Sequence, residues 1–312
     1  MTKAAAKEFE DLSVVIPAFN EAEGIAATLT GLLAAAPGAE VIVVDDCSRD
    51  ATSAAAARFP GVRVVRHSFN RGQGAALKTG MRLATRPYVA WFDADNEHRA
   101  EDLLRIVRRC RAESLAAVIG QRTTGSASLT RAMGKSVIRA IGRGLKISAG
   151  SDLNCGLRVF RRKLVQRYLA LIPDRFSSSL VTTLVMLERQ YPIAFEPIAT
   201  NPRIGHSTVR MKDGFEAILQ LVRAVLLFAP LRVFLRLGGW AFAIGVVYSI
   251  AIAVIRESGI PTAGVFIMTT GILTAFLGLI ADQISQLRLG QINDGYADLD
   301  GEEAEVKNER RA

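Results

Sequence analysis

Cysteine and aromatic residues are scarce in this chain of 312 residues, and each scarcity excludes a class of function. The three cysteines, Cys47, Cys110 and Cys155, are too widely spaced for a zinc motif or a disulfide framework, and they fit a reducing compartment. Aromatic residues make up only 7% of the chain and do not alternate with basic residues, which argues against nucleic acid as a partner. The formal net charge of +9 therefore indicates an anionic membrane surface or phosphorylated substrates.

The two ends of the chain are polar. Residues 1–11 lack the apolar stretch of a signal peptide, so we expect no secretory leader there. The last 22 residues hold seven acidic and three basic side chains. A segment of that composition cannot bury enough apolar surface to fold alone, and we expect residues 290–312 to form a disordered acidic tail.

Acidic residues are absent from Ser114 to Ser151, whereas basic residues recur there at a spacing of four. These basic residues are Arg131, Lys135, Arg139 and Arg143. Apolar residues occupy a neighbouring stripe, so the pattern predicts a basic amphipathic helix over residues 127–147 that lies on a membrane surface. A charged face in contact with water alone is the alternative.

Two long runs contain no charged residue, Leu237–Ile255 and Ile260–Ala281. At about 1.5 Å per residue, each run is long enough to cross a hydrocarbon core of about 30 Å. Two buried core helices are the alternative interpretation. Arg232 and Arg236 precede the first run and Arg288 follows the second. The positive-inside tendency therefore predicts an integral protein of the cytoplasmic membrane, with the N-terminal domain and both termini in the cytoplasm.

Phe215–Leu235, within the segment 211–236 just before the first run, is mainly apolar but contains Arg223, Arg232 and Pro230. Such a stretch resembles interfacial helices more than a third span. Within the first run, small residues offer a surface for assembly into a homo-oligomer. They are Gly238, Gly239, Ala241, Ala243 and Gly245.

The region 12–210 alternates short apolar runs with helical segments. The predicted strands are Leu12–Pro17, Val41–Val44, Val62–Val65, Tyr88–Phe92 and Leu115–Arg122. Helices are expected over roughly 23–35 and 73–83, with Pro37-Gly38 ending the first. This order predicts an α/β domain with a mainly parallel sheet, in which ligands bind beyond the carboxyl ends of the strands.

Three of these strands end in polar clusters, which we interpret as one site. Asn20 and Glu21 follow the first strand, and Asp45 and Asp46 end the second. The Tyr88 strand leads into Asp93 and Asp95, with Glu97 two residues further on. Because side chains alternate along an extended chain, Asp93 and Asp95 converge and suit Mg²⁺ or Mn²⁺. A solvated acidic turn is the alternative for an isolated pair of this kind.

The Gly72-Gln73-Gly74 sequence invites comparison with dinucleotide-binding loops, but the comparison fails. Leu77 stands where the third glycine belongs, and the loop follows the third strand, not the first. We therefore interpret these glycines as a tight turn between a strand and a helix.

Four motifs together resemble family 2 glycosyltransferases of the GT-A fold. They are Ser13-Val-Val-Ile-Pro-Ala-Phe-Asn-Glu21, Val43-Val-Asp-Asp-Cys-Ser-Arg-Asp50, Asn70-Arg-Gly-Gln-Gly-Ala-Ala-Leu-Lys-Thr-Gly80 and Phe92-Asp-Ala-Asp95. A fifth, Asp152-Leu-Asn-Cys-Gly156-Leu-Arg158-Val-Phe160-Arg-Arg162, is similar to the polyprenyl-phosphate branch. That branch includes dolichyl-phosphate mannose synthases and bacterial enzymes that load glucose or aminoarabinose onto undecaprenyl phosphate.

The resemblance implies a nucleoside diphosphate sugar donor, linked to UDP or GDP, and an inverting reaction. Asp93 and Asp95, with Glu97 as a further candidate, would hold Mg²⁺ or Mn²⁺ on the diphosphate. The residues implied on the nucleotide-sugar side are Pro17, Asn20, Glu21, Asp45, Asp46, Lys78 and Asp93. Asp45 or Asp46 would accept a hydrogen bond from the base, although either one is equally suited to cap a helix.

The acceptor implied by the resemblance is a polyprenyl phosphate at the membrane. Its phosphate is already an anion, so the site needs cationic side chains more than a strong general base. The candidates for contacts with the acceptor phosphate are Arg122, Arg131, Lys135, Arg203, Ser207 and Arg210. Attraction to lipid headgroups is the alternative for each. Asp152 is expected to orient the acceptor or to cap a turn, and His98 and His206 to be structural.

Departures from the family pattern narrow the prediction. Cys47 replaces a common glycine, Glu97 replaces a common glutamine, and no Gln-x-x-Arg-Trp sequence occurs, which argues against a processive synthase. Two rival functions remain. One is a transferase with a lipid or glycan hydroxyl as acceptor, for which Asp152 is the candidate base. The other is a non-catalytic, sugar-nucleotide-binding membrane subunit.

Overall fold

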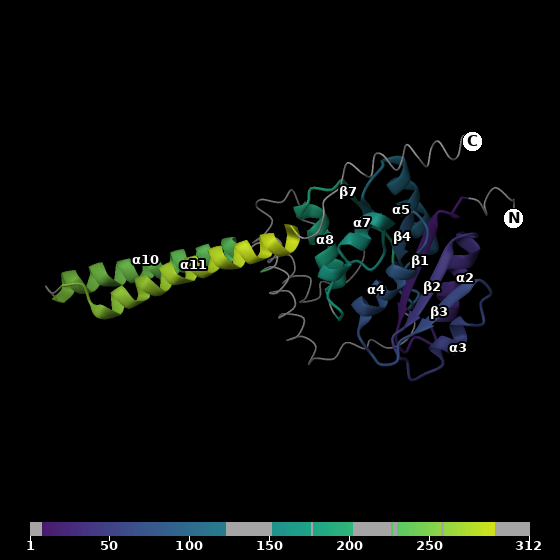
Figure 1. Cartoon of the computed structure of the whole chain (residues 1–312), viewed down its shortest axis with the longest axis horizontal. Coiled ribbons are helices and arrows are strands. Elements are labelled where there is room, and N and C mark those ends of the chain that lie inside the picture. The colour runs from purple at the N-terminus through teal and green to yellow at the C-terminus, as the bar shows by residue number, and fades with distance from the viewer. Residues whose placement is uncertain are drawn as a thin grey trace. The chain divides into compact units, whose positions relative to one another are not determined.

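The computed structural model describes residues 8–122, 152–175, 177–201, 226, 230–256 and 259–290 (Figure 1). The chain divides into two compact units, Met1–Phe228 and Ala229–Ala312. The predicted helix 127–147, most of the predicted interfacial stretch 211–236 and the tail from residue 291 lie outside the described residues. The same holds for Arg131, Lys135, Arg203, Ser207 and Arg210.

The first unit is built on one seven-stranded sheet. Its strands are β1 (Leu12–Ala18), β2 (Glu40–Asp45), β3 (Val62–Arg66), β4 (Tyr88–Trp91), β5 (Ala117–Arg122), β6 (Arg158–Arg161) and β7 (Ile193–Ile198). They lie in the order β3-β2-β1-β4-β6-β5-β7, and every pair is parallel except those that involve β6. The prediction of a mainly parallel sheet is therefore confirmed.

The register of the central strands places the three polar clusters at one edge of the sheet. Ala18, the last residue of β1, pairs with Asp45, and Val15 pairs with Trp91 at the end of β4. Because β1, β2 and β4 run in the same direction, the loops that follow them leave the sheet on the same side.

Two strands of the sheet, β6 and β7, are not among those predicted from the sequence, and β6 is the one that bears on the site. It runs antiparallel between β4 and β5, and Arg158, its first residue, pairs with Trp91 at the end of β4. An antiparallel strand begins where its neighbour ends. The residues just before β6, 152–157, therefore lie next to the loop that carries Asp93.

Helices cover both faces of the sheet (Figure 1). They are α2 (Ile25–Ala35), α3 (Thr52–Ala56), α4 (Gln73–Leu83), α5 (Ala100–Ala112), α7 (Arg162–Arg167) and α8 (Ser178–Glu188), with the short 3₁₀ helix η1 (Leu169–Leu171). Side chains alternate along β1, so they point to opposite faces of the sheet. Val14 and Ile16 face α2 and α5 and belong to a buried hydrophobic cluster, whereas Val15 packs against Gly80 of α4 on the other face.

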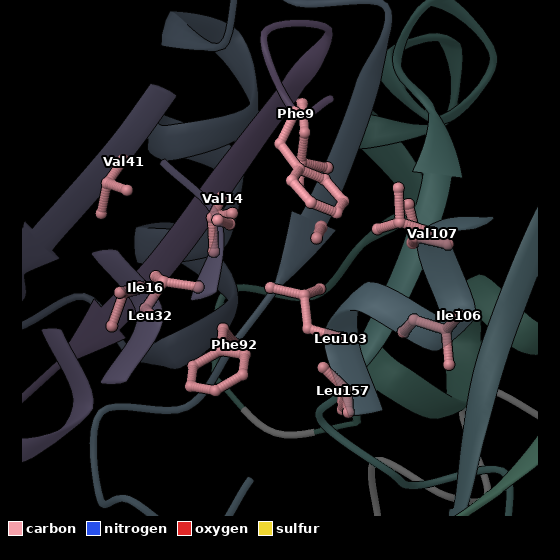
Figure 2. Close-up of a cluster of buried hydrophobic side chains, with 14 of the residues drawn as sticks. Phe9, Val14, Ile16, Leu32, Val41, Phe92, Leu103, Ile106, Val107 and Leu157 are labelled. Atoms are coloured by element: carbon pink, nitrogen blue, oxygen red, sulfur yellow. The ribbon is translucent and has the colours of Figure 1, made fainter. Parts of the chain in front are cut away.

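Figure 2 shows this core cluster between the sheet and helices α2 and α5. Leu103, Ile106 and Val107 of α5 are spaced so that they share one helix face, and all three are fully buried. Phe92 immediately follows β4 and is also buried in the cluster. Burying a large apolar side chain contributes roughly 1.5–3 kcal/mol, so Phe92 anchors the start of the loop that carries Asp93 and Asp95.

The second unit contains two long helices, α10 (Pro230–Arg256) and α11 (Thr262–Gly290). Both are long and apolar enough to cross a membrane by length and composition, over Pro230–Ile255 and Thr262–Leu287. Pro230 is the first residue of α10, a position that suits proline because the N–H group it lacks would have no helical partner there. Residues 230–236 of the predicted interfacial stretch therefore continue into the long helix.

Glycines lie where α10 and α11 pack against each other. A Cβ atom on Gly238 would come within 2.5 Å of the Gly271 carbonyl oxygen, and one on Gly245 within 2.7 Å of Met268. Gly264 meets Ser249 in the same way, whereas Gly239 has no neighbour within 4 Å. Two of the residues that we expected to support a homo-oligomer, Gly238 and Gly245, are thus used inside the hairpin. Assembly between copies stays a prediction.

Candidate functional site

The Asp93 carboxylate is held by two side chains, one at each oxygen. His98 Nε2 lies 3.0 Å from Asp93 Oδ2, and Gln73 Nε2 donates to Asp93 Oδ1 at 3.4 Å. The Asp93 side chain keeps 27% of its surface exposed. Asp95 is almost completely buried, and its Oδ1 accepts the backbone N–H of Glu97 at 3.1 Å. The loop after β4 is therefore ordered by its own carboxylates.

Gly156 leaves room for the Asp93 carboxylate. A Cβ atom on Gly156 would lie 2.1 Å from Asp93 Oδ2, closer than any real contact of that kind. The backbone at Gly156 does not have a positive φ, so glycine is needed for space and not for conformation. The antiparallel strand β6 is what brings Gly156 to this point.

His98, for which the sequence predicts a structural role, contacts the Asp93 carboxylate directly. It is 3% exposed, and its ring lies edge-on to Phe92 at a centroid distance of 6.0 Å. Burial alone lowers the pKa of His98, but the hydrogen bond with Asp93 and the neighbouring carboxylates raise it above its usual value. Burial is the largest single influence on Asp93 and raises its pKa. The hydrogen bond with His98 and the charges of His98, Arg122 and Arg158 together outweigh burial, so the pKa of Asp93 is lowered overall.

Arg122, at the end of β5, pairs with Asp152 and faces Glu97. Arg122 Nε donates to Asp152 Oδ2 at 2.7 Å, and Nη2 donates to Asp152 Oδ1 at 3.4 Å. Arg122 Nη1 lies 3.6 Å from Glu97 Oε1. Burial alone lowers the pKa of Arg122, but the hydrogen bond and charge of Asp152 raise it above its usual value. Asp152 also accepts the backbone N–H of Asn154, so it both pairs with Arg122 and orders its own turn.

A second arginine, Arg158, is completely buried behind this cluster. It donates to the carbonyl oxygens of Cys155 and Ser179 and to the hydroxyl groups of Thr182 and Thr183. Burial lowers the pKa of Arg158 to about 10, which still leaves the side chain charged at neutral pH. Arg158 thus fixes the segment that carries Gly156. Apart from its place in the fifth motif, nothing in the local sequence indicates this role.

The charges near the D-x-D motif suit a divalent cation. Four carboxylates lie near two guanidinium groups, so negative charges outnumber positive ones in this cluster: Asp93, Asp95, Glu97 and Asp152 against Arg122 and Arg158. Among the residues that the structure describes, no group of three or more His, Cys, Asp or Glu side chains could hold a metal ion. Mg²⁺ in nucleotide sites is commonly held by one or two carboxylates and completed by phosphates and water, so Asp93 and Asp95 fit that pattern.

Asp45 and Asp46, at the end of β2, are both buried and both already hydrogen-bonded. Asp45 accepts the backbone N–H of Ser48 at 2.8 Å and the hydroxyl of Ser53, and so orders the turn that follows β2. Asp46 accepts the backbone N–H groups of Arg71 and Gly72, at 2.9 and 2.6 Å. The two carboxylates therefore connect different loops at the nucleotide side of the predicted site.

His67, which the sequence analysis did not consider, completes the contacts of Asp46. Its Nδ1 lies 2.7 Å from Asp46 Oδ1, and its Nε2 lies 2.9 Å from the Thr79 hydroxyl. His67 follows the edge strand β3 and Thr79 lies on α4. Because these contacts join residues far apart in the sequence, no local pattern could have revealed them.

Asn20 and Glu21 lie in the loop after β1, which is joined to the loop after β2. The backbone N–H of Asn20 donates to Ser48 Oγ, and that of Glu21 donates to Thr52 Oγ1, both at 2.9 Å. Asn20 has a φ of +56°, a conformation that asparagine tolerates better than most residues. Pro17 lies within β1, beside Val44 of β2.

Lys78 makes its contacts away from these loops. Its Nζ donates to the Ile172 carbonyl at 3.0 Å and pairs with Asp174. Gly72 begins the turn into α4 with a φ of +102°, which confirms the interpretation of a tight strand-to-helix turn. At Gly74, glycine is needed for space as well, because a Cβ atom there would collide with the Pro173 carbonyl oxygen. The local sequence does not indicate this contact.

Two family models match the chain. The model described as glycosyl transferase family 2 matches residues 13–169, and the one described as GtrB C-terminal hairpin matches residues 229–287. The first covers half of the chain and contains every residue of the site cluster.

Similar proteins agree with this assignment. An uncharacterized protein of Methanocaldococcus jannaschii is 31% identical over 230 residues, which cover 68% of this chain and 91% of the relative. An undecaprenyl-phosphate 4-deoxy-4-formamido-L-arabinose transferase of Sodalis glossinidius is 26% identical, over 87% of this chain and 85% of the relative. An undecaprenyl-phosphate mannosyltransferase of Micrococcus luteus is 37% identical over 35% of this chain and 46% of the relative.

Solved structures agree at the level of the fold. A glucosyl-3-phosphoglycerate synthase from Mycobacterium tuberculosis, in complex with Mn²⁺, UDP and phosphoglyceric acid, superposes with a TM-score of 0.58 at 18% identity. The match covers 72% of this chain and 80% of that one. With the GT-A sheet, the acidic strand ends and the C-terminal hairpin in place, the chain belongs to glycosyl transferase family 2 and is a glycosyltransferase.

Proposed function

We propose that this protein transfers a sugar from a nucleoside diphosphate sugar to a polyprenyl phosphate at the cytoplasmic face of a membrane. One observation carries the proposal: the D-x-D carboxylates and the partly buried guanidinium group of Arg122 meet at one edge of the sheet. Relatives named as undecaprenyl-phosphate transferases and the candidate spans in α10 and α11 support the acceptor class.

Asp93 and Asp95 would hold Mg²⁺ or Mn²⁺ on the diphosphate of the donor. The ion would neutralise the leaving nucleoside diphosphate. His98 and Gly156 keep the Asp93 carboxylate in place, and the lowered pKa of Asp93 keeps it ionised at neutral pH. The M. tuberculosis enzyme has a similar fold and was solved with Mn²⁺ and UDP-glucose, which supports the proposal of a divalent ion here.

The nucleotide would lie beyond β1 and β2, where Asn20, Glu21, Asp45 and Asp46 order the surrounding loops. Asp45 or Asp46 would accept a hydrogen bond from the nucleotide base and keep its internal hydrogen bonds, because a carboxylate offers about four acceptor positions. Lys78 supports the segment 172–174 in the described structure, so its proposed contact with the donor requires it to leave Asp174.

The acceptor phosphate would bind at Arg122. A phosphate that is already ionised attacks the sugar without a strong general base, and inversion would give a β-linked product. A hydroxyl acceptor would need such a base, and Asp152, the candidate for that role, is already paired with Arg122. This pairing favours the phosphate acceptor. Arg131, Lys135, Arg203, Ser207 and Arg210 stay predictions for the same subsite.

A transfer assay in membranes tests the proposal. Radiolabelled UDP-glucose, UDP-GlcNAc and GDP-mannose are offered separately, with undecaprenyl phosphate and Mg²⁺ or Mn²⁺. We expect one donor to label the lipid fraction, and we expect EDTA or Asp95→Ala to reduce that label at least a hundredfold, since the diphosphate would lose its counter-charge. Thermal unfolding of Asp95→Ala verifies that the variant is folded.

The outcomes separate the rival functions. Nucleotide binding that depends on metal, without lipid label from any donor, would favour a different acceptor. An absence of nucleotide binding in the parent would contradict the enzymatic proposal altogether.

A further inference from the structure

The turn Gly72-Gln73-Gly74, which leads from β3 into α4, packs closely against the distant segment 172–175. A Cβ atom on Gly72 would lie 2.6 Å from the Asp174 carbonyl oxygen, and one on Gly74 would collide with the Pro173 carbonyl oxygen. Real Cβ atoms do not come that close to backbone oxygens. The two glycines therefore allow segment 172–175 to lie directly on the turn.

Segment 172–175 also occupies the N-terminus of α4. The first N–H groups of a helix have no partner within the helix, and they are a common binding place for phosphate. Here the Ala75 N–H donates to the Asp174 carbonyl at 2.8 Å, and the Gly74 N–H donates to the Arg175 carbonyl at 3.4 Å. Backbone oxygens of the chain itself thus take the place that a donor phosphate would have at this helix end.

Lys78 ties segment 172–175 to α4. Its Nζ donates to the Ile172 carbonyl at 3.0 Å and pairs with the Asp174 carboxylate. A lysine has three N–H donors, so these two contacts leave at most one for a ligand. On the other side of the segment, Ser178 Oγ donates to the Pro173 carbonyl at 3.3 Å. The segment is therefore fixed between α4 and the first residue of α8.

The opposite side of the same turn holds Asp46. The backbone N–H groups of Arg71 and Gly72 donate to the Asp46 carboxylate at 2.9 and 2.6 Å. Asp46 is buried at the end of β2, where the nucleotide is proposed to bind. A shift of the turn would displace two of the N–H groups that orient this carboxylate.

We propose that Lys78 is a positioning residue, which holds segment 172–175 on the glycine turn and so keeps Asp46 oriented for the nucleotide. The family resemblance implies Lys78 on the nucleotide-sugar side, and the contacts of Lys78 give it an indirect role there in place of a direct bond to the donor. The inference rests on the proposed function, since the nucleotide is the ligand that Asp46 would receive.

The test uses the full chain in detergent and two independent measurements. Calorimetric titration with UDP or with GDP, in the presence of Mn²⁺, measures nucleotide binding. Hydrogen–deuterium exchange of the peptide that contains Gly74 and Ala75 reports the contact with segment 172–175 without any ligand. The variants are Lys78→Met, Lys78→Arg, Asp174→Asn and the double variant Lys78→Met with Asp174→Asn.

Glu113→Gln is the matched control. The Glu113 carboxylate is 51% exposed, as Asp174 is at 52%, and it also pairs with a basic side chain, that of Arg109. Glu113 follows the last residue of α5, at the end of that helix remote from the D-x-D loop. Thermal unfolding verifies that each variant is folded.

Lys78→Met is expected to speed exchange at Gly74 and Ala75 and to weaken nucleotide binding about threefold. Binding weakens in proportion to the fraction of molecules in which the turn keeps its position. Asp174→Asn should change both quantities in the same direction, and the double variant should lose no more than Lys78→Met, because both changes remove one shared contact. Lys78→Arg and Glu113→Gln should resemble the parent.

Tighter nucleotide binding by Asp174→Asn, together with weaker binding by Lys78→Met, would overturn the inference, because Asp174 would then be withholding Lys78 from the donor. Unchanged exchange at Gly74 and Ala75 in Lys78→Met would overturn it as well. A parent that binds neither UDP nor GDP would contradict the proposed function, and the exchange measurement would still decide whether Lys78 holds the segment.

Discussion

At the scale of single residues, Gly156 controls the geometry of Asp93. Gly156→Ala adds one methyl group that would lie 2.1 Å from Asp93 Oδ2, so either the carboxylate or the segment before β6 has to move. We expect Mn²⁺ affinity in the presence of UDP to fall about tenfold or more, since metal sites tolerate little displacement of a ligand. Electron paramagnetic resonance of free Mn²⁺ measures this directly.

Gly31→Ala is the control for that experiment. Gly31 lies on an exposed face of α2, and a Cβ there has no neighbour within 4 Å. This change should leave Mn²⁺ affinity as it is and raise stability by about 0.5–1 kcal/mol, because alanine favours a helix over glycine. Unchanged Mn²⁺ binding by Gly156→Ala would show that Asp93 is not a ligand or that it does not need Gly156.

Cys47 is a second residue whose backbone explains a departure from the family. Its φ is +65°, a conformation that costs most side chains about 1 kcal/mol and glycine almost nothing. Cys47→Gly should therefore raise the free energy of unfolding by about 0.5–1 kcal/mol, while Cys47→Ala should not. Denaturant titrations of both variants test this, and equal stability of the two would show that the backbone relaxes around cysteine.

At the scale of elements, close packing between α10 and α11 depends on glycine. A Cβ on Gly271 would come within 2.6 Å of the Gly238 carbonyl oxygen. Gly271→Leu should therefore separate the two helices and lower the stability of the hairpin by about 1–3 kcal/mol, the usual range for overpacking. Thermal unfolding in detergent, followed by circular dichroism, measures the loss.

Gly239→Leu is the matched change on the same hairpin. A Cβ on Gly239 has no neighbour within 4 Å, so the added side chain should be accommodated. A similar loss for both variants would indicate that Gly239 packs against something else, and a second copy of the chain is then the first possibility to examine.

The strand β6 is the element that assembles the site. It brings the fifth sequence motif against the loop that carries the D-x-D motif, and it places Arg158 beneath them. Helices and hydrophobic strands can be read from local patterns, but β6 is short, and its four residues begin and end with arginine. Its pairing depends on β4 and β5, which lie far away in the sequence.

At the scale of the whole molecule, the charge at the site is opposite to that of the chain. The chain carries a formal charge of +9, whereas the carboxylates around Asp93 outnumber the arginines beside them. Many of the basic residues lie in segments outside the described residues. An acidic centre in a basic protein suits a site that binds a cation and then two phosphorylated substrates, because the cation and the basic surroundings both attract phosphate.

The sequence by itself determined the α/β class, the mainly parallel sheet, the acidic strand ends and the two apolar helices. These features follow from local chemistry, because alternation, β-branched runs and charge-free runs are legible over a few neighbouring residues. The motif resemblance then indicated the family, which the comparisons confirmed.

Tertiary structure alone decided how the charged residues are partnered. Gly156 lies against Asp93, Arg122 lies between Asp152 and Glu97, and His67 joins Asp46 to α4. These contacts join segments separated by tens of residues, and their geometry depends on the order and direction of the strands. Glu97 lies 3.6 Å from Arg122 in the folded chain, because only packing determines which opposite charge lies nearest, and its role as a metal ligand stays a prediction.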